Sequence, residues 1–467
     1  MKRLILLLIL LPLFTPESNG QQAYRIKKRS NYNNPELPKV DGTDIWNDLT
    51  GWHDPRNNKE YIIAGSTDSI YFFDITNPDS MVLLQVRGGG SVYAKNRDFE
   101  VYDHYVYCVS DQAFGAGALQ VFDLNFLPDS VHEVYHSDVL GKFTHTVFID
   151  KPSKRLYMPM NSKASGFSAL DVLSLDNPEQ PSFLMKLDVP QKPGGGFLFS
   201  RVHEMYARND TAYLSCEDAG LFIFDLRNPN QQQLIGSITS YPDRGYNHSS
   251  WLDSSGRYLM FTDENMGLDI KIYDLKNMSD PVFVSQFNSS TLAMPHNAYW
   301  LNDFAWVSSY HDGVVVYNIR NPANPEKVAW FDTHYEVPEL YGGYKGCWGI
   351  YPYLPSGNII ASDLTTGIWV LTPEKDLLSA PKIQSEQLAI QLYPNPTSSQ
   401  LTIQGLPISS EKTKVSVWSM LGNLVMQTEI EPHQTQFQLP NLSEGIFILH
   451  LQTEKGLVVK RFQIKHP

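Results

Sequence analysis

Short runs in which apolar and polar residues alternate recur along most of the chain. A period of two is typical of β-strands with one buried face. One stretch predicts four such strands in succession, at 145–150, 155–160, 168–173 and 181–188, with turn residues between them. Few stretches have the 3.6-residue period of an amphipathic helix. The pattern therefore predicts an all-β fold built from many short strands.

A short motif also recurs about every 50 residues. It consists of an aromatic or aliphatic residue, then Asp or Asn, then an aliphatic residue, and often Asn-Pro a little later. The Asp or its equivalent falls at positions 74, 123, 171, 225, 274, 318 and 370, with spacings of 49, 48, 54, 49, 44 and 52. Repeats of about this length with four strands each are typical of propeller blades. We predict a seven-bladed β-propeller.

The two ends of this repeat region predict how the ring closes. The seventh repeat ends after its third strand, at Leu371, and an extended segment at Ala23–Lys27 precedes the first repeat. A propeller closed by its N-terminal strand has no open sheet edge in its last blade. We therefore expect the N-terminal strand to complete the seventh blade.

A second region of alternating residues follows a break in the pattern. Residues 372–387 contain two prolines and several charges and are predicted to form a linker. Strands are expected at 400–403, 414–418, 436–439, 446–451 and 458–464. The pattern predicts a small Ig-like β-sandwich over residues 388–467.

Composition limits the classes of function. The chain has 467 residues, with 37 Lys+Arg against 50 Asp+Glu and a formal net charge of −13. It is 12% aromatic and 19% charged, which is typical of a globular protein and not of a disordered one. An acidic chain without a Lys/Arg-rich run argues against nucleic-acid binding.

The N-terminus has the pattern of an export signal. Lys2 and Arg3 precede an apolar run at Leu4–Phe14, and the small residues Ser18 and Gly20 follow. We predict a signal peptide at 1–20 and a propeller at 21–371. No later segment is apolar enough to span a membrane. The three cysteines are far apart in the sequence and are expected to be buried thiols.

The C-terminal region resembles a known family of sorting signals. The segments that carry the likeness are Leu392–Thr397, Val417–Gly422, Leu442–Phe447 and Val459–Phe462. They are similar, in this order, to the type A C-terminal sorting domain of the Bacteroidetes type IX secretion system. The resemblance implies export through the Sec route, binding of residues 388–467 to the type IX machinery, and release or attachment to surface lipopolysaccharide. The alternative is a carbohydrate-binding or spacer sandwich.

The repeat region resembles the choice-of-anchor B family, which is built from LVIVD-type repeats. The likeness rests on Asp44–Trp46, Tyr246–Leu252, Pro295–Asn297 and Tyr351–Asn358, and it departs from the family at 47–50. This resemblance implies a propeller at the cell surface or outside the cell. It implies no reaction.

Six residues occupy equivalent places at the start of successive repeats. They are Asp98, His145, His203, His248, His296 and Trp348. The first strand of a blade lies nearest the axis, so we expect these side chains to meet at the channel mouth and bind a ligand. The four histidines, with an oxygen from Asp98, form a candidate site for a divalent metal. The alternative, which we favour, is a repeated structural role for each histidine.

The loops after the second strands carry acidic residues that are expected on the same face. They are Asp68, Asp111, Asp218, Asp263, Glu264, Asp312 and Asp363. Turn chemistry explains such residues, since Asp bonds nearby backbone N–H groups. The alternative is an acidic rim that attracts cations or basic ligands.

Standard catalytic motifs do not occur in the sequence. We therefore favour a secreted or surface-attached recognition module, not an enzyme, that binds a glycan, peptide or protein at its axial face. The alternative is a metal-dependent hydrolase or oxidoreductase. In it the four histidines would be ligands, with Asp98 or Glu264 as proton acceptor.

Overall fold

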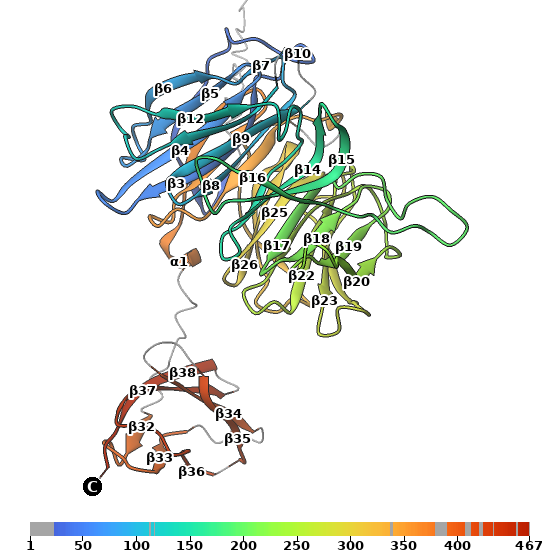
Figure 1. Cartoon of the computed structure of the whole chain (residues 1–467). Helices are drawn as coiled ribbons and strands as arrows, with labels where there is room; N and C mark the ends of the chain where they lie inside the picture. Colours follow the sequence, from blue (N-terminus) through green and yellow to red (C-terminus); the bar gives the residue numbers. More distant parts are fainter. Residues whose placement is uncertain are drawn as a thin grey trace, which may run out of the picture. The chain divides into compact units, whose positions relative to one another are not determined.

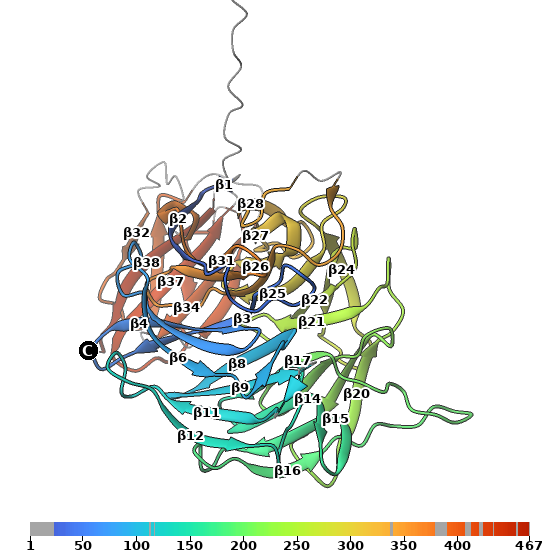
Figure 2. The same ribbon diagram turned by 90° about the horizontal axis from the view of Figure 1, so that it is seen from above.

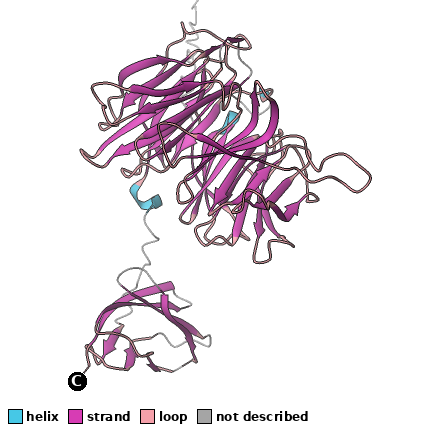
Figure 3. Ribbon diagram, in the orientation of Figure 1, coloured by secondary structure: helices cyan, strands magenta, loops and turns pink. Residues whose placement is uncertain are grey.

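The computed structural model describes residues 23–466 except 112–113, 116, 337–339, 379–389, 407–411, 420–423, 433 and 454–455. The described chain is almost entirely β-structure, with only short helices at η1 (Tyr310–Asp312) and α1 (Lys375–Leu378) (Figure 3). It divides into two compact units, one ending at Glu374 and the other beginning at Lys375 (Figure 1). The predicted signal peptide at 1–20 and most of the predicted linker at 372–387 lie outside the described residues.

Seven antiparallel sheets make up the first unit. The first three are β3 (Trp46–Asp54), β4 (Lys59–Ser66), β5 (Ser69–Asp74) and β6 (Val82–Gly88); β8 (Asn96–Tyr102), β9 (Tyr105–Asp111), β11 (Leu119–Asp123) and β12 (His132–Ser137); and β13 (Phe148–Asp150), β14 (Arg155–Lys163), β15 (Gly166–Ser174) and β16 (Ser182–Lys186). The next two are β17 (Glu204–Arg208), β18 (Thr211–Ser215), β19 (Leu221–Asp225) and β20 (Gln233–Ile238); and β21 (Asn247–Leu252), β22 (Tyr258–Asp263), β23 (Ile270–Asp274) and β24 (Val282–Phe287).

The last two sheets include the N-terminal strands. The sixth has β25 (Pro295–Leu301), β26 (Phe304–Ser309), β27 (Gly313–Asn318), β28 (Glu326–Phe331) and, at its outer edge, β1 (Ala23–Tyr24). The seventh has β29 (Cys347–Tyr351), β30 (Ile359–Asp363), β31 (Gly367–Pro373) and, outermost, β2 (Ile26–Tyr32). A small extra pair is formed by β7 (Ser91–Val92) and β10 (Phe114–Gly115). Pairing with β31 begins at Ile26, within the predicted segment, and continues to Tyr32.

The seven sheets form a closed ring (Figure 2). The first strand of each sheet contacts the first strand of the next, from β3 through β8, β13, β17, β21 and β25 to β29. The strand β29 contacts β3, which joins the last sheet to the first. Because β2 comes from the start of the chain and pairs with β31 near the end of this unit, the ring is held together by backbone hydrogen bonds.

Large apolar side chains fill the space between neighbouring sheets. Phe72 of the first sheet meets Phe122 of the second edge to face, with 5.7 Å between ring centroids. Both side chains are fully buried, and burial of each is worth about 1.5–3 kcal/mol. All three cysteines are buried free thiols, as the sequence predicts.

The recurring acidic residue has a structural reason. At the end of the third strand, Asp74 accepts a hydrogen bond from the backbone N–H of Thr76 at 2.8 Å, and Asp274 accepts one from Lys276 at 2.9 Å. These bonds form the turn towards the outer strand.

In the third repeat, the predicted motif residue, Asp171, lies three residues before the residue that forms the turn. Asp171 lies inside β15, fully buried, and accepts hydrogen bonds from Asn161 at 2.7 Å and Lys163 at 2.6 Å. The equivalent turn residue is Ser174, whose hydroxyl accepts the N–H of Asp176 at 3.2 Å. The sequence motif tolerates a serine at this position because a hydroxyl makes the same local bond.

The second unit consists of two antiparallel sheets around one core. One sheet has β32 (Gln391–Tyr393), β33 (Gln400–Gln404) and β36 (Gln436–Gln438). The other has, in spatial order, β35 (Leu424–Ile430), β34 (Thr413–Ser419), β37 (Gly445–Thr453) and β38 (Gly456–Ile464). Val415, Val417, Leu449 and Leu451 are fully buried between them. The strand β35, an edge strand that is only partly buried, was not predicted.

Among the described residues, no helix is both long and apolar enough to cross a lipid bilayer.

Candidate ligand-binding and metal-binding site

The four histidines predicted at the axis lie side by side. His145 lies shortly before β13, and His203 immediately precedes β17. His248 lies in β21 and His296 in β25. Successive ring centroids are 4.2, 4.5 and 4.4 Å apart, and Trp348 of β29 continues the series 4.7 Å from His296. All four imidazoles are buried. We call these four histidines the imidazole arc.

Local backbone irregularities place the arc. The pairing of β21 with β22 shifts register between Asn247 and Ser250, and that of β25 with β26 shifts between Pro295 and Ala298. A β-bulge of this kind bends a strand and redirects its side chains. His248 and His296 lie within these two register shifts, so a β-bulge positions each of the two side chains.

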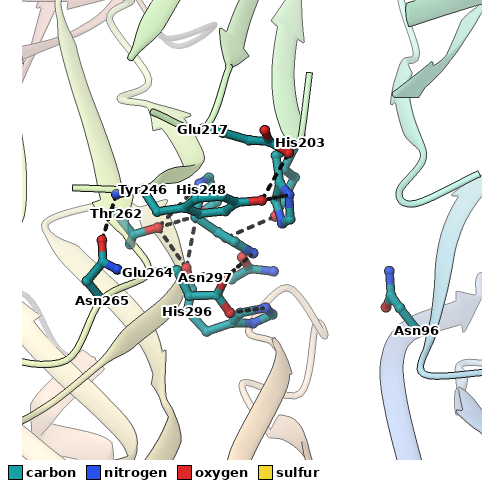
Figure 4. A network of polar contacts seen from close by, with 12 residues as sticks. Asn96, His203, Glu217, Tyr246, His248, Thr262, Glu264, Asn265, His296 and Asn297 are labelled. Atoms are coloured by element: carbon teal, nitrogen blue, oxygen red, sulfur yellow. Dashed lines mark hydrogen bonds and ion pairs between the residues drawn. The ribbon is translucent and has the colours of Figure 1, made fainter. Parts of the chain in front are cut away.

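Oxygen atoms lie next to the outer nitrogen, Nδ1, of the rings; Figure 4 shows His203 with its partner Tyr246 and with Glu217. The Nδ1 atom of His145 is 2.5 Å from a carboxylate oxygen of Asp111. Nδ1 of His203 is 2.9 Å from the hydroxyl of Tyr246, which donates to Glu217 at 3.1 Å.

Of the other two rings, only that of His296 follows the same pattern, because Nδ1 of His248 faces the Asn297 amide, which donates to it at 3.2 Å. Nδ1 of His296 donates to the backbone carbonyl of Trp348 at 2.7 Å. Nδ1 of His248 lies 3.5 Å from the Glu204 carboxylate.

The inner nitrogens face one another and one carboxylate. Nε2 of His145 and Nε2 of His203 are 3.0 Å apart. The Glu264 carboxylate lies 3.8 Å from Nε2 of His248 and 3.9 Å from Nε2 of His296, and it accepts a 2.5 Å hydrogen bond from Tyr310. Ligand atoms of His203, His248 and Glu264 all lie within 4.8 Å of one another.

Burial controls the charge of the arc. It lowers the pKa of His203 and His248 well below the ordinary value, and the neighbouring histidines lower both further. It lowers the pKa of His296 to about 3. For His145 burial also disfavours the charged form, but the Asp111 carboxylate outweighs it and the pKa is raised. Burial raises the pKa of Glu264 to about 7.

A cavity of about 500 Å³ extends along the axis next to the arc. It is lined by residues from the first strands of all seven sheets. Four of its carboxyl groups belong to Asp48, Asp98, Glu100 and Glu204. Burial raises the pKa of Asp98 to about 6 and that of Glu100 to about 7, and it raises the pKa values of Asp48 and Glu204 still more clearly. The cavity is therefore an acidic, weakly solvated space.

Aromatic rings form another part of the cavity wall. Trp251 lies 4.8 Å from both Tyr206 and Tyr299 and stacks on Tyr353 at 5.8 Å, measured between ring centroids. Among the described residues, the buried hydroxyl of Tyr353 has no hydrogen-bond partner. The wall thus combines ring faces with unused polar atoms, which suits a small ligand.

Asp98 lies in the cavity wall, where its carboxylate ties two sheets together. One of its oxygens accepts the N–H of Phe99 at 2.8 Å, and the other accepts the N–H of Val147 at 2.7 Å. Both oxygens are therefore used by the backbone.

The seven predicted rim acids do not share one exposed surface. Asp263 and Asp363 are fully buried, Asp111 and Glu264 are nearly so, and Asp68 and Asp312 are half-buried. Only Asp218 among the seven is exposed. Most of their oxygens are used locally; Asp363, for example, accepts from Thr333 at 2.7 Å. Turn and core contacts account for most of these positions, whereas Asp111 and Glu264 face the imidazole arc.

Most residues of the cavity wall are not among those predicted from the sequence, although a signal for them exists. Asp98 and Glu100 are two residues apart on β8, and Glu204 and Tyr206 are two residues apart on β17. Side chains at this spacing share one face of a strand. Polar residues with period two on the first strand of several repeats therefore identify the axial face.

Structural comparison defines the class of the first unit. The chain resembles the β-propeller domain of Myceliophteria thermophila Cps50 (Swd1), with a TM-score of 0.50 and 11% identity, over 74% of this chain and 98% of that chain. At this identity the likeness shows the fold alone, which is a β-propeller.

The C-terminal unit has a family match of its own. Residues 391–465 match the family of secretion system C-terminal sorting domains. The unit is thus a type IX sorting domain, which directs the protein to export and to the cell surface. No curated protein matches the chain.

Proposed function

We propose that this chain is a surface or secreted recognition protein, exported by the type IX system, whose seven-bladed β-propeller binds a ligand in its axial cavity. In this proposal a signal peptide at 1–20 is removed, the propeller spans 21–371, and residues 388–467 form an Ig-like sorting domain after the linker at 372–387. The motif resemblance to choice-of-anchor B, LVIVD-type propellers supports the same assignment.

Two features of the ring support seven blades. Six of the seven sheets have four strands in chain order from the axis outward, and the seventh has three that β2 completes; the first strands contact one another in chain order. The contact of β29 with β3 leaves no gap for a further sheet between them.

The charge of the cavity indicates the class of ligand, and it is the observation that carries the proposal. Five acidic residues line it, namely Asp48, Asp98, Asp150, Glu100 and Glu204, against the two basic residues Lys151 and Arg208. Buried carboxylates that lie close together repel one another, and a cation relieves this repulsion. Aromatic faces also attract cations.

A ligand that carries a protonated amine, such as a basic side chain of a peptide, therefore fits better than a neutral glycan. Lys151 and Pro152 are exposed and also line the cavity, so the cavity reaches the surface at this turn.

The test compares two probes of equal length and different charge. The full chain is titrated calorimetrically with pentane-1,5-diamine and with pentane-1,5-diol. We expect the diamine to bind and the diol not to bind. Replacing one carboxylate that pairs with the amine costs roughly 1.5–3 kcal/mol, so Glu100→Gln is expected to weaken diamine binding by about ten- to a hundredfold.

A matched control separates this site from general acidity. Glu36 is exposed. The Glu36→Gln variant removes the same charge and should bind the diamine like the wild type. Equal affinity for diamine and diol, or equal loss in both variants, would overturn the proposal.

The second candidate function is metal-assisted hydrolysis or redox chemistry. The convergence of four imidazoles and Glu264 beside the cavity favours it, because three such ligands with an open position are typical of catalytic metal sites. It depends on whether the arc holds a metal.

A further inference from the structure

The hydrogen positions on the arc follow from its partners. A backbone carbonyl and a carboxylate can only accept hydrogen bonds, so His296 and His145 carry their hydrogen on Nδ1. The hydroxyl hydrogen of Tyr246 points to Glu217, so Tyr246 accepts from Nδ1 of His203. A neutral imidazole has one N–H, so the neutral rings of His203 and His296 each have a bare electron pair on Nε2. His145, whose Nδ1 faces the Asp111 carboxylate, can carry a proton on both nitrogens.

The electron pair of His203 faces a ring nitrogen of His145. Nε2 of His145 and Nε2 of His203 are 3.0 Å apart and buried. Two acceptors at this distance repel each other unless a proton or a metal cation lies between or beside them. Around the same space Nε2 of His248 and of His296 point to Glu264. The centre of the arc thus gathers nitrogen electron pairs and one carboxylate, which a proton on His145 or a metal cation can neutralise.

The spacing of these atoms suits a metal ion. Zinc binds imidazole nitrogen and carboxylate oxygen at about 2.0–2.2 Å, so two ligands at a tetrahedral angle are about 3.4 Å apart. Nε2 of His248 lies 3.8 Å from the Glu264 carboxylate, close to this value, and ligand atoms of His203, His248 and Glu264 all lie within 4.8 Å of one another. Small side-chain rotations bring such atoms to one ion.

The outer contacts of the rings match those of metal ligands. A histidine that binds metal generally donates its other N–H to a carboxylate, carbonyl or similar group, which fixes the tautomer and the ring plane. Asp111, Tyr246 and the Trp348 carbonyl do this for three rings of the arc. Asp111 is almost fully buried, and its second oxygen has no partner among the described residues. This buried carboxylate is therefore committed to orienting His145.

The geometry points to a site for one divalent transition metal, of the zinc class, bound by Nε2 of His203, Nε2 of His248 and the carboxylate of Glu264. His145 or His296 completes the set or leaves a fourth position open. His145, His248 and His296 also line the axial cavity, so an open position would face it. The proposal is independent of the amine ligand, because it uses different side chains.

Cobalt provides a direct test, because Co²⁺ in a tetrahedral site has a strong visible absorption. The full chain is dialysed against chelator and titrated with Co²⁺, and the metal content is measured by elemental analysis. We expect one ion per chain, a tetrahedral spectrum and displacement by Zn²⁺. His248→Ala and Glu264→Gln should each weaken binding by at least about a hundredfold.

Two further variants keep the test decisive. Tyr246→Phe leaves every ligand in place but removes the partner of His203, and loss of such a partner typically weakens binding by about ten- to a hundredfold. His132 is exposed and outside the arc, so His132→Ala should bind like the wild type. The proposal is overturned if the dialysed wild type binds no Co²⁺ or binds it without a tetrahedral spectrum. It is also overturned if folded His248→Ala and Glu264→Gln variants bind as tightly as the wild type.

The two proposals fail in distinguishable ways. Diamine binding is measured on the chelator-treated protein, so it does not require the metal. Loss of Co²⁺ binding without loss of diamine binding overturns the metal site alone.

Discussion

Asp263 and Glu264 are consecutive residues at the end of β22, and both are buried, yet their surroundings differ. Asp263 pairs with the fully buried Lys271 at 2.8 Å and also accepts bonds from Tyr241 at 2.9 Å and the N–H of Gly245 at 3.1 Å. Glu264 faces two imidazoles and the Tyr310 hydroxyl. Among the described residues, no lysine or arginine is paired with Glu264.

The comparison separates a structural carboxylate from a candidate functional one. Burying a charge is costly unless it is paired and hydrogen-bonded. The fold supplies that compensation in full for Asp263 and only in part for Glu264. A buried carboxylate left without its cation, next to bare nitrogen atoms, is what a site for an external cation requires.

The largest expected effect is at the ion pair. Lys271→Met keeps the length of the side chain but leaves the Asp263 charge unpaired, which should lower the free energy of unfolding by roughly 3–5 kcal/mol. Urea unfolding measures it. The double variant Lys271→Met/Asp263→Asn should regain part of this loss, and a single variant as stable as the wild type would contradict a charged, paired Asp263.

The second-largest effect is expected from one hydrogen bond to the Asp263 carboxylate. Tyr241→Phe removes the donor to Asp263 and should cost roughly 1.5–3 kcal/mol, the usual range for a bond to a charged group. Urea unfolding at neutral pH measures the change, with Tyr258→Phe, at the half-buried start of β22, as a control. A loss below about 0.5 kcal/mol would show that Lys271 and the backbone alone satisfy Asp263.

A pH effect is expected in the cavity. Burial raises the pKa of Glu100 to about 7, with a further rise from Asp98 and an opposing effect from Lys151. An amine pairs with the ionised form, and an alkyl amine stays protonated below about pH 10. Diamine affinity should therefore rise between about pH 6 and pH 8, by at most about tenfold. Calorimetry should show a flatter profile for Glu100→Gln; an affinity that falls over this range would contradict the assignment.

The smallest effect is expected at Glu264. Glu264→Gln removes a charge whose burial is only partly compensated and keeps an oxygen for the Tyr310 hydroxyl. The stability of the metal-free protein should change by less than about 1 kcal/mol. Thermal unfolding of chelator-treated protein measures it. A loss close to that of Lys271→Met would mean that both neighbours are structural and that the comparison fails.

Much of the fold was predictable because its signals are local. The alternation of apolar and polar residues predicted most strands of the repeats. The Asp at the end of the third strand revealed the repeat length, because it recurs wherever its carboxylate bonds the backbone two residues later. In the third repeat the predicted position was wrong, because Ser174 takes the place of Asp at this turn. The strand β35 was missed because an edge strand that is partly exposed has a weak hydrophobic pattern.

The candidate site was predictable only in part. The four histidines were found because they recur once per repeat. Their partners were found only in part. Asp111 and Glu264 were predicted as acidic residues after second strands, but which acid faces a histidine depends on contacts between distant segments, and Glu264 could not be told from the neighbouring Asp263 by sequence. Asp48, Glu100 and Glu204 were missed for the same reason.

The sequence by itself determined the strand pattern, the repeat length and the sorting domain, because periodicity, turn chemistry and a family motif are each written within a few tens of residues. The tertiary structure alone decided which side chains meet at the axis and which of two adjacent buried carboxylates is neutralised by lysine. The physical reason is that closing a ring brings together atoms up to hundreds of residues apart, and the pKa of a buried group depends on those neighbours and not on its own segment.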